Sequence, residues 1–166
     1  MITRDAVIER LRPIQDPEMP ISIVDLGLIE DVRIESEDDT TRVSVDVLPT
    51  FVGCPALDMI RDDIVRALED ADEIDAADVT FLHAPPWTVD RITEVGRASL
   101  REHGVTVPTR ESNGDKVSLQ ISAIPCPFCD SRSTRLESPF GPTRCRSVYY
   151  CPACKNTFEH MKRVES

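Results

Sequence analysis

The chain reads Cys126-Pro127-Phe128-Cys129, then twenty-one residues, then Cys151-Pro152-Ala153-Cys154. Two CxxC pairs so spaced are typical of a tetrahedral four-thiolate metal site, because each pair sets two sulfurs on one tight turn. The intervening residues are polar and turn-rich, and a segment that buries so little apolar surface rarely folds without a staple. The sequence therefore predicts a zinc ribbon with the ligands Cys126, Cys129, Cys151 and Cys154.

Two other uses of the four cysteines are weighed against zinc. A pair of disulfides is disfavoured, because the chain opens on a charged amphipathic segment rather than a signal peptide, which indicates a reducing, cytoplasmic location. Iron suits the same tetrahedral sulfur geometry. Zinc is favoured over iron because closed structural sites of this kind usually hold zinc.

A fifth cysteine, Cys145, lies between the two pairs. One interpretation is a small buried residue of the ribbon sheet, as free cysteines often are. The other is an additional thiolate for metal or cluster transfer, favoured by the flanking Arg144 and Arg146. The base rate of buried cysteine favours the first interpretation.

The charge is unevenly distributed along the 166 residues, whose net charge is −11. Residues 1–107 carry 10 basic and 24 acidic side chains, whereas residues 124–166 carry 7 basic and 4 acidic ones. An acidic body argues against nucleic-acid binding, and no apolar run is long enough to span a membrane. The basic ribbon remains able to meet an acidic surface.

The first 107 residues are predicted to form an α+β domain. Apolar residues recur at helical spacing in 4–11, 55–70 and 89–103, and they alternate in 32–35, 43–47 and 77–82. The order α-β-β-α-β-α predicts a small mixed three-stranded sheet with helices on one side. Residues 108–123 are predicted to be a linker with a strand at 116–121 that leads into the ribbon, which occupies 124–166.

Cys54 is the most reactive-looking residue of this body. Pro55 suits the first position of the helix predicted at 55–70, which would place Cys54 at the N-cap. Unpaired amides and the helix dipole lower the pKa of a thiol there, whereas burial among apolar groups would raise it. Both outcomes stay open. Asp16 and Glu18, on a proline-rich loop, form a weaker candidate pair for metal binding or for positioning a thiol.

Trp87 precedes the helix predicted at 89–103, for which Thr88 is the expected N-cap. The favoured interpretation of Trp87 is a lid over the core, and the alternative is an anchor for a partner protein. The sequence shows no acid–base pair or nucleophile–base pair that would indicate an enzyme.

The motifs of the body resemble a known family. Residues 16–20 (DPEMP), 25–28 (DLGL) and 50–55 (TFVGCP) resemble the small iron–sulfur-assembly domain of SufT-like factors. Residues 85–88 (PPWT), 104–108 (GVTVP), 140–145 (FGPTRC) and 158–162 (FEHMK) resemble the D subunits of phenylacetyl-CoA epoxidase systems (PaaD). One departure is Pro142, where a serine is expected.

This resemblance implies an accessory role in aerobic phenylacetate degradation. The epoxidase of such systems is a di-iron oxygenase fed by a flavin and iron–sulfur reductase, and the D subunit is thought to help its assembly. Carried over, Cys54 would handle iron or a cluster, with Asp16 and Glu18 shaping its surroundings. One thiolate cannot hold a cluster that usually takes four ligands, so any cluster would be transient and would need a second protomer or Cys145.

The implied partners are the oxygenase or reductase subunits and iron–sulfur assembly proteins. The alternative function is a non-catalytic adaptor that docks on the oxygenase or its reductase without handling a cluster.

Overall fold

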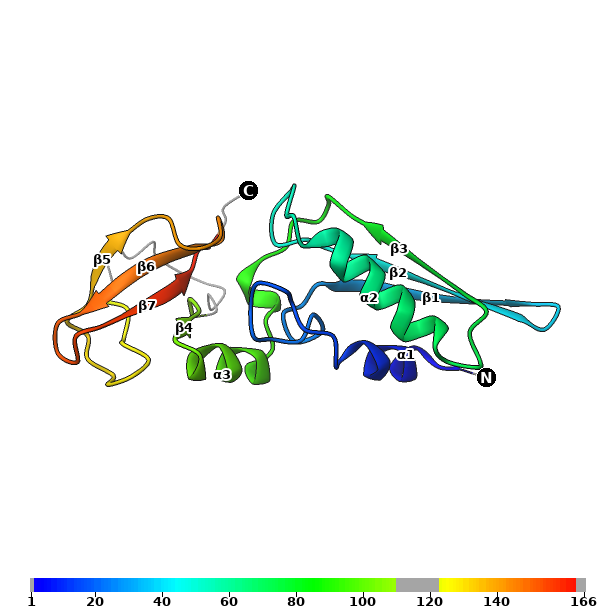
Figure 1. Cartoon of the computed structure of the whole chain (residues 1–166), viewed down its shortest axis with the longest axis horizontal. Helices are drawn as coiled ribbons and strands as arrows, with labels where there is room; N and C mark the ends of the chain where they lie inside the picture. Colours follow the sequence, from blue (N-terminus) through cyan, green and yellow to red (C-terminus); the bar gives the residue numbers. More distant parts are fainter. Residues whose placement is uncertain (1, 110–122, 164–166) are drawn as a thin grey trace, which may run out of the picture. The chain divides into compact units, whose positions relative to one another are not determined.

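The structure is a computed structural model that describes residues 2–109 and 123–163. The chain divides into two compact units, Met1–Gly96 and Arg97–Ser166. The division falls eleven residues before the end of the predicted α+β domain, and the predicted boundaries themselves stay a prediction. The elements, labelled in Figure 1, are α1 (Arg4–Leu11), β1 (Ile29–Glu37), β2 (Thr40–Val47), α2 (Leu57–Glu69), β3 (Ala76–Phe81), the 3-10 turn η1 (Val89–Arg91), α3 (Glu94–Glu102), β4 (Val105–Thr106), β5 (Arg135–Ser138), β6 (Arg146–Cys151) and β7 (Asn156–Met161).

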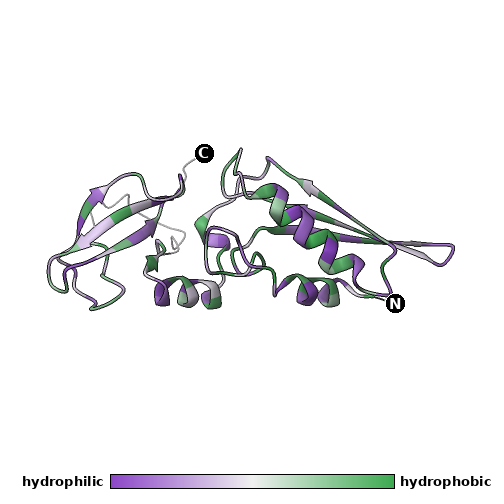
Figure 2. Cartoon of the chain, viewed as in Figure 1, coloured by the Kyte–Doolittle hydropathy of each residue, from purple (hydrophilic) through white to green (hydrophobic). Residues whose placement is uncertain are grey.

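The first unit contains the predicted three-stranded mixed sheet. Strands β1 and β2 pair antiparallel as a hairpin, and β3 pairs parallel with β2 after the crossover helix α2. Helices α1 and α2 contact each other and the sheet, so both cover the same face. Val43, Val45 and Val47 of β2 are fully buried against them. Figure 2 shows α2 in alternating hydrophobic and hydrophilic stripes, as expected for a helix with one face in a core.

The loop between α1 and β1 completes this core. Its apolar side chains are buried, because the chain folds back on itself instead of running over the surface. Asp16 organises the fold-back: its side chain accepts the N–H of Glu18 at 2.8 Å, and its own N–H donates to the Ile21 carbonyl at 2.9 Å. The buried residues are Met19, Ile21, Ile23, Leu26 and Leu28.

Residues 87–93 clamp the end of that loop. The Trp87 indole donates to the Leu26 carbonyl at 2.9 Å, and the Arg91 guanidinium donates to the Gly27 carbonyl at 2.8 Å. Gly27 has φ +76, and a Cβ there would lie 2.5 Å from the Arg91 carbonyl oxygen. A side chain at Gly27 is therefore excluded both by backbone conformation and by the approach of Arg91.

The helix predicted at 89–103 is interrupted, and Thr88 is not its cap. The chain forms the short turn η1 and then starts α3 at Glu94. Thr93 causes the interruption: its hydroxyl donates to the Asp25 carboxylate at 2.9 Å and accepts the N–H of Gly96 at 3.0 Å. Its N–H donates to the Asp25 carbonyl at 2.9 Å instead of continuing the helix. A tertiary contact has overridden the helical pattern.

The start of the second helix also differs from the prediction. Helix α2 begins at Leu57 with Ala56 as the N-cap, not at Pro55 with Cys54 as the N-cap. The N–H of Leu57 donates to the Cys54 carbonyl at 3.3 Å, which closes a tight turn ahead of the helix. Cys54 therefore lies on a turn two residues before the cap.

The second unit contains a four-stranded sheet in the order β4-β7-β6-β5. Strands β5, β6 and β7 form an antiparallel meander, as a ribbon requires. The short strand β4 adds in parallel to β7, with Val105 opposite Glu159 and Thr106 opposite His160. The sequence analysis did not predict β4. The strand that it predicted at 116–121 lies outside the described residues.

Replacing Thr93 with Ala should lower the free energy of unfolding by about 1–2 kcal/mol, because the cap of α3 and the bond to Asp25 are lost together. Thr93→Ser keeps the hydroxyl and should stay within about 0.5 kcal/mol of wild type. Urea unfolding followed by circular dichroism measures both values. Equal losses in the two variants would contradict the role of the hydroxyl.

Candidate functional site

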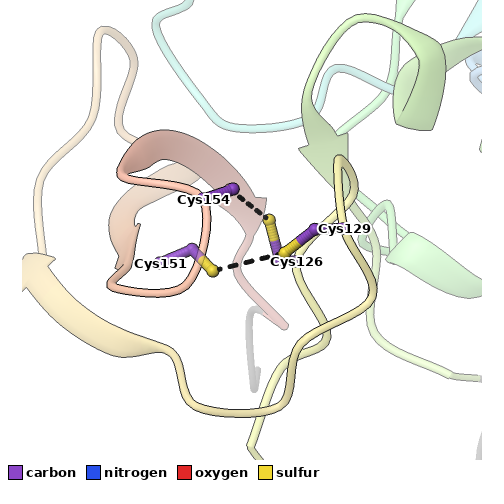
Figure 3. A group of neighbouring side chains, drawn as sticks. All are labelled: Cys126, Cys129, Cys151 and Cys154. Carbon is purple, nitrogen blue, oxygen red and sulfur yellow. Dashed lines mark hydrogen bonds between the residues drawn. The ribbon is translucent and has the colours of Figure 1, made fainter.

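The four predicted ligands meet at one point of the second unit. Their sulfurs all lie within 4.8 Å of one another. Cys126 is 3.6 Å from Cys154, and Cys129 is 3.6 Å from Cys151, so each close pair joins the two CxxC turns (Figure 3). Ligand sulfurs at about 2.3 Å from zinc are separated by roughly 3.8 Å in a tetrahedron. The observed spacing is that of a metal site, and all six cysteines of the chain are free of disulfides.

Both CxxC turns have the same backbone geometry. The N–H of Asp130 donates to the Cys126 carbonyl at 2.9 Å, and the N–H of Lys155 donates to the Cys151 carbonyl at 2.8 Å. Asp130 and Lys155 have φ +58 and +61, a conformation that non-glycine residues adopt at a cost of roughly 1 kcal/mol. The strain recurs at the equivalent place in each turn, where the turn must close so that both sulfurs face the metal.

The electrostatics of the sulfurs favour a cation between them. The backbone N–H of Cys154 stabilises the Cys151 thiolate and lowers its pKa to about 6. The Ser131 N–H also favours the Cys129 thiolate, but burial and the neighbouring thiols outweigh it and raise the pKa of Cys129 to about 12. Four thiolates at these distances repel one another, and a divalent ion removes that repulsion. The donor set therefore fits zinc, which neutralises the thiolates and closes the ribbon.

The ligands also form the core of the ribbon. Cys126 and Cys151 are fully buried and pack with Phe158, and Ile124 and Tyr149 lie against them. The residues that would hold the metal therefore also make up this cluster of the ribbon core.

Cys145 is buried, at 4% exposure, and is not a member of the four-sulfur group. Its sulfur lies 3.1 Å from the Thr143 hydroxyl, and its carbonyl accepts the N–H of Lys162 at 2.8 Å. The structural interpretation of Cys145 is thereby favoured.

Cys54 lies in the first unit on a turn-rich loop between β2 and α2. It is half-buried, next to the exposed Val52 and Gly53. Gly53 has φ +83, and nothing lies within 4 Å of the position of a Cβ there. The space at Gly53, the residue before Cys54, is therefore open.

The carboxylate candidates do not form a metal site with Cys54 alone. Within residues 2–109 and 123–163, the four-cysteine group is the one set of three or more cysteine, histidine or carboxylate side chains close enough to hold an ion. Asp16 is buried and bonded to its own loop, whereas Glu18 is half-buried. Asp16 thus also orders its own loop, and the roles predicted for Asp16 and Glu18 beside Cys54 stay predictions.

Trp87 has the role that the sequence analysis favoured. It is 4% exposed and donates to the Leu26 carbonyl, so it covers the core. Little of its ring is left for a partner.

A buried polar group in the ribbon was missed by sequence reasoning. The Arg146 guanidinium is buried, donates to the Thr143 hydroxyl at 2.9 Å and forms an ion pair with Glu159. In the sequence Arg146 was only a charge flanking Cys145. Strand alternation puts Arg146 on the face opposite Cys151, and burial along β6 does not alternate, so nothing in the sequence marked Arg146 as buried or identified Glu159 as its partner.

Comparison with known proteins assigns the chain to a family. It is 32% identical to the Escherichia coli protein provisionally named as the D subunit of 1,2-phenylacetyl-CoA epoxidase, over 93% of this chain and 89% of that protein. The chain belongs to this D-subunit family. The family described as PaaD zinc beta ribbon domain matches residues 110–162, and that described as iron-sulfur cluster assembly protein matches residues 4–81. The ribbon of this chain is therefore a zinc ribbon.

The first unit also matches proteins that lack a ribbon. The Fe-S protein maturation auxiliary factor SufT of Staphylococcus aureus is 35% identical over 51% of this chain and 93% of its own length. A Bacillus anthracis structure described as a domain of unknown function, DUF59, is 27% identical and covers 58% of this chain and 89% of its own, with a TM-score of 0.51. These matches make the first unit an iron–sulfur-assembly domain.

In the described part of the chain, every helix is too short or too polar to cross a membrane.

Purified protein should contain one zinc ion per chain, and Cys151→Ser should lose it together with the heat-induced unfolding transition of the ribbon, because the ligands are the core. Cys145→Ser is the matched control and should keep the zinc. Metal analysis and calorimetry measure both properties. Equal zinc loss in the two variants would contradict the assignment of ligands.

His160 should make the ribbon sensitive to acid. Burial lowers the pKa of His160 to about 4, and the Thr106 hydroxyl lies 2.8 Å from its Nδ1. The unfolded chain binds this proton below about pH 6.5, so stability is lost as the pH falls from about 6.5 to 4. At saturating zinc, lowering the pH from 7 to 4.5 should decrease the free energy of unfolding of both proteins. The decrease should be about 1–3 kcal/mol smaller for His160→Gln than for wild type. Equal decreases in the free energy of unfolding of wild type and His160→Gln, measured by urea unfolding, would contradict this prediction.

Proposed function

We propose that this chain assists the assembly of iron–sulfur or iron sites in the phenylacetyl-CoA epoxidase system of aerobic phenylacetate degradation. Cys54 takes up the iron or the cluster and passes it to a client. The observation that carries the proposal is the half-buried thiol on an open loop of an iron–sulfur-assembly domain, in a chain whose relative along nearly its full length is named as part of an epoxidase.

The chemistry of Cys54 supports transfer rather than storage. One cysteine supplies one thiolate, and clusters are usually held by four ligands. A cluster on Cys54 therefore keeps coordination sites for thiols from the donor or the client. Fewer protein bonds mean faster release, and delivery needs fast release.

The clients that suit this proposal are the oxygenase or the iron–sulfur reductase of the system, and the donors are iron–sulfur assembly proteins. All of these act in the reducing cytoplasm, where the thiolates of Cys54 and of the ribbon stay unoxidised. The four ligands of the ribbon have no part in the transfer chemistry, because their thiolates are committed to zinc. The chain is an accessory factor and not an enzyme, which agrees with the naming of its relatives as maturation auxiliary factors.

A docking adaptor is the competing function. In that case the chain holds the oxygenase or the reductase in place, and Cys54 has no chemical role. The two functions differ only in what happens when the thiol is removed.

Cys54→Ser should lower the iron and acid-labile sulfide content of the co-expressed reductase, or the iron content of the oxygenase, several-fold. The zinc content of the chain itself should be unchanged. Cys145→Ser is the control, because it removes a thiol outside the proposed site. Unchanged client loading with Cys54→Ser would leave the adaptor as the function.

A further inference from the structure

Helix α3 (Figure 1) belongs to both compact units of the chain. The division between the units falls after Gly96, so residues 94–96 of the helix belong to the first unit and residues 97–102 to the second. Each end of α3 is bound by its own set of residues, and each set lies within one unit. A helix of 9 residues is not stable by itself in water, so its persistence depends on these contacts.

The loop between α1 and β1 holds the start of α3. The Thr93 hydroxyl donates to the Asp25 carboxylate at 2.9 Å and accepts the N–H of Gly96 at 3.0 Å, which caps the helix. A Cβ on Gly96 would lie 2.8 Å from the Asp25 carbonyl oxygen and 2.8 Å from the Ile21 side chain, so the first turn packs tightly against the loop. One hydroxyl makes both bonds, and hydrogen bonds that share a group strengthen one another, so the closed loop and the helical start of α3 favour each other.

The first CxxC turn of the ribbon holds the end of α3. Arg101 forms an ion pair with Asp130, the residue that follows the ligand Cys129. Gly104, whose N–H donates to the Arg101 carbonyl at 3.0 Å, has φ +76. A Cβ on Gly104 would lie 2.9 Å from the ring of Phe128, which stands between the two cysteines of that CxxC turn. The turn that supplies two zinc ligands therefore contacts the last turn of α3.

The ribbon sheet adds stronger contacts than the ion pair does. The side chains of Arg101 and Asp130 are 43% and 79% exposed, and an exposed ion pair contributes little. By contrast, the N–H of Glu159 donates to the Gly104 carbonyl at 2.9 Å, and β4, which follows directly, pairs with β7. These two contacts exist only while the ribbon is folded, and the ribbon folds around its zinc. Zinc binding therefore determines whether the end of α3 keeps its contacts.

We infer that α3 couples the zinc site of the ribbon to the loop that carries Asp25. Zinc binding keeps the end of α3 in place, the folded helix keeps its cap at Thr93, and the cap keeps the loop closed. Thermodynamic linkage makes the effect mutual: if zinc stabilises the closed loop, the closed loop strengthens zinc binding by the same factor. Each link is a contact within one unit, and only the helix itself passes from one unit to the other.

The effect of zinc loss is local to this loop and to residues 87–93, which clamp it. The family described as iron-sulfur cluster assembly protein matches residues 4–81, which end before the clamp. The sheet and α2 lie within the matched residues, so we expect them to stay folded without zinc. The loop also carries Asp16 and Glu18, the predicted neighbours of Cys54. Zinc loss would thus loosen the surroundings of the transfer site, a consequence that, unlike the coupling, rests on the proposed function.

Trp87 reports on the loop, because it is the only tryptophan of the chain and its indole donates to the Leu26 carbonyl. Removal of zinc from the full-length protein with a chelator should shift the emission of Trp87 to longer wavelength and increase its quenching by acrylamide, and added zinc should reverse both changes. Cys151→Ser should show the shifted emission without chelator, whereas the control Cys145→Ser should match wild type. Unchanged emission in the zinc-free protein would overturn the inference.

Hydrogen exchange in the same zinc-free protein tests whether the effect is local. Amides of the loop between α1 and β1 should exchange faster than in the zinc-loaded protein, whereas those of β2 should keep their protection. Equal loss of protection in the loop and in β2 would mean that the first unit unfolds as a whole, and it would overturn a coupling through α3 and its cap.

Thr93→Ala tests the coupling in the opposite direction, since Thr93 lies in the first unit. It should weaken zinc binding about fivefold in competition with a chromophoric chelator, whereas Thr93→Ser should stay within about twofold of wild type. Val45→Ala is the matched control, because Val45 is fully buried in β2 rather than in the loop, and it should also stay within about twofold. Wild-type zinc affinity in Thr93→Ala would overturn the inference, as would an equal loss of affinity in Val45→Ala.

None of these measurements involves a client or the Cys54 thiol. The proposed function is judged by client loading with Cys54→Ser, so the coupling and the proposed function can fail separately.

Discussion

The ribbon depends on four sulfurs that are at once its core and its metal site. Cys126 and Cys151 are fully buried and pack with Phe158, and in the described chain Ile124, Tyr149 and Cys154 are the partly buried residues packed against this cluster. A unit with so small an interior cannot balance the conformational entropy of its chain by apolar burial alone. The metal supplies the missing stabilisation, and the strained φ at Asp130 and Lys155 is tolerated because metal binding fixes both turns. Substitution of a ligand therefore removes a fold as well as an ion.

In the first unit, hydrogen bonds to backbone carbonyls provide the constraint that the metal provides in the ribbon. Trp87 and Arg91 donate to the carbonyls of Leu26 and Gly27, and Thr93 binds Asp25. Two motifs that lie far apart in the sequence are thus two halves of one clamp. The Cys54 loop connects β2 of the sheet to α2, and both of these elements have residues in the core. Rigid support beneath an open loop is the usual arrangement for a reactive group.

The sequence predicted those parts of the structure that short-range residue patterns determine. The valines of β2 alternate because one face of the sheet is buried, so the sheet was predictable. The spacing of the two CxxC pairs identifies the four metal ligands, so the metal centre was predictable. The wrong or missing predictions concern segments whose structure depends on a residue far away in the sequence. Thr93 interrupts a good helical pattern because Asp25 binds it, and strand β4 forms only because β7 offers an edge. Cys54 is not the N-cap of α2, because the chain forms a further turn before the helix begins. The roles of Cys54, Asp16, Glu18 and Cys145 in iron handling stay predictions.

The thiols that would hold zinc and the thiol proposed to deliver iron lie in different units of the chain. The ribbon sulfurs lie close together and at least two of them are buried, which suits an ion that never leaves. Cys54 is half-buried, follows the exposed Gly53 and is not part of the four-sulfur group, which suits a ligand that must leave. A factor of this kind also has to find its client, and neither set of thiols can do that. The acidic first unit and the basic ribbon differ in charge, so they select different partners.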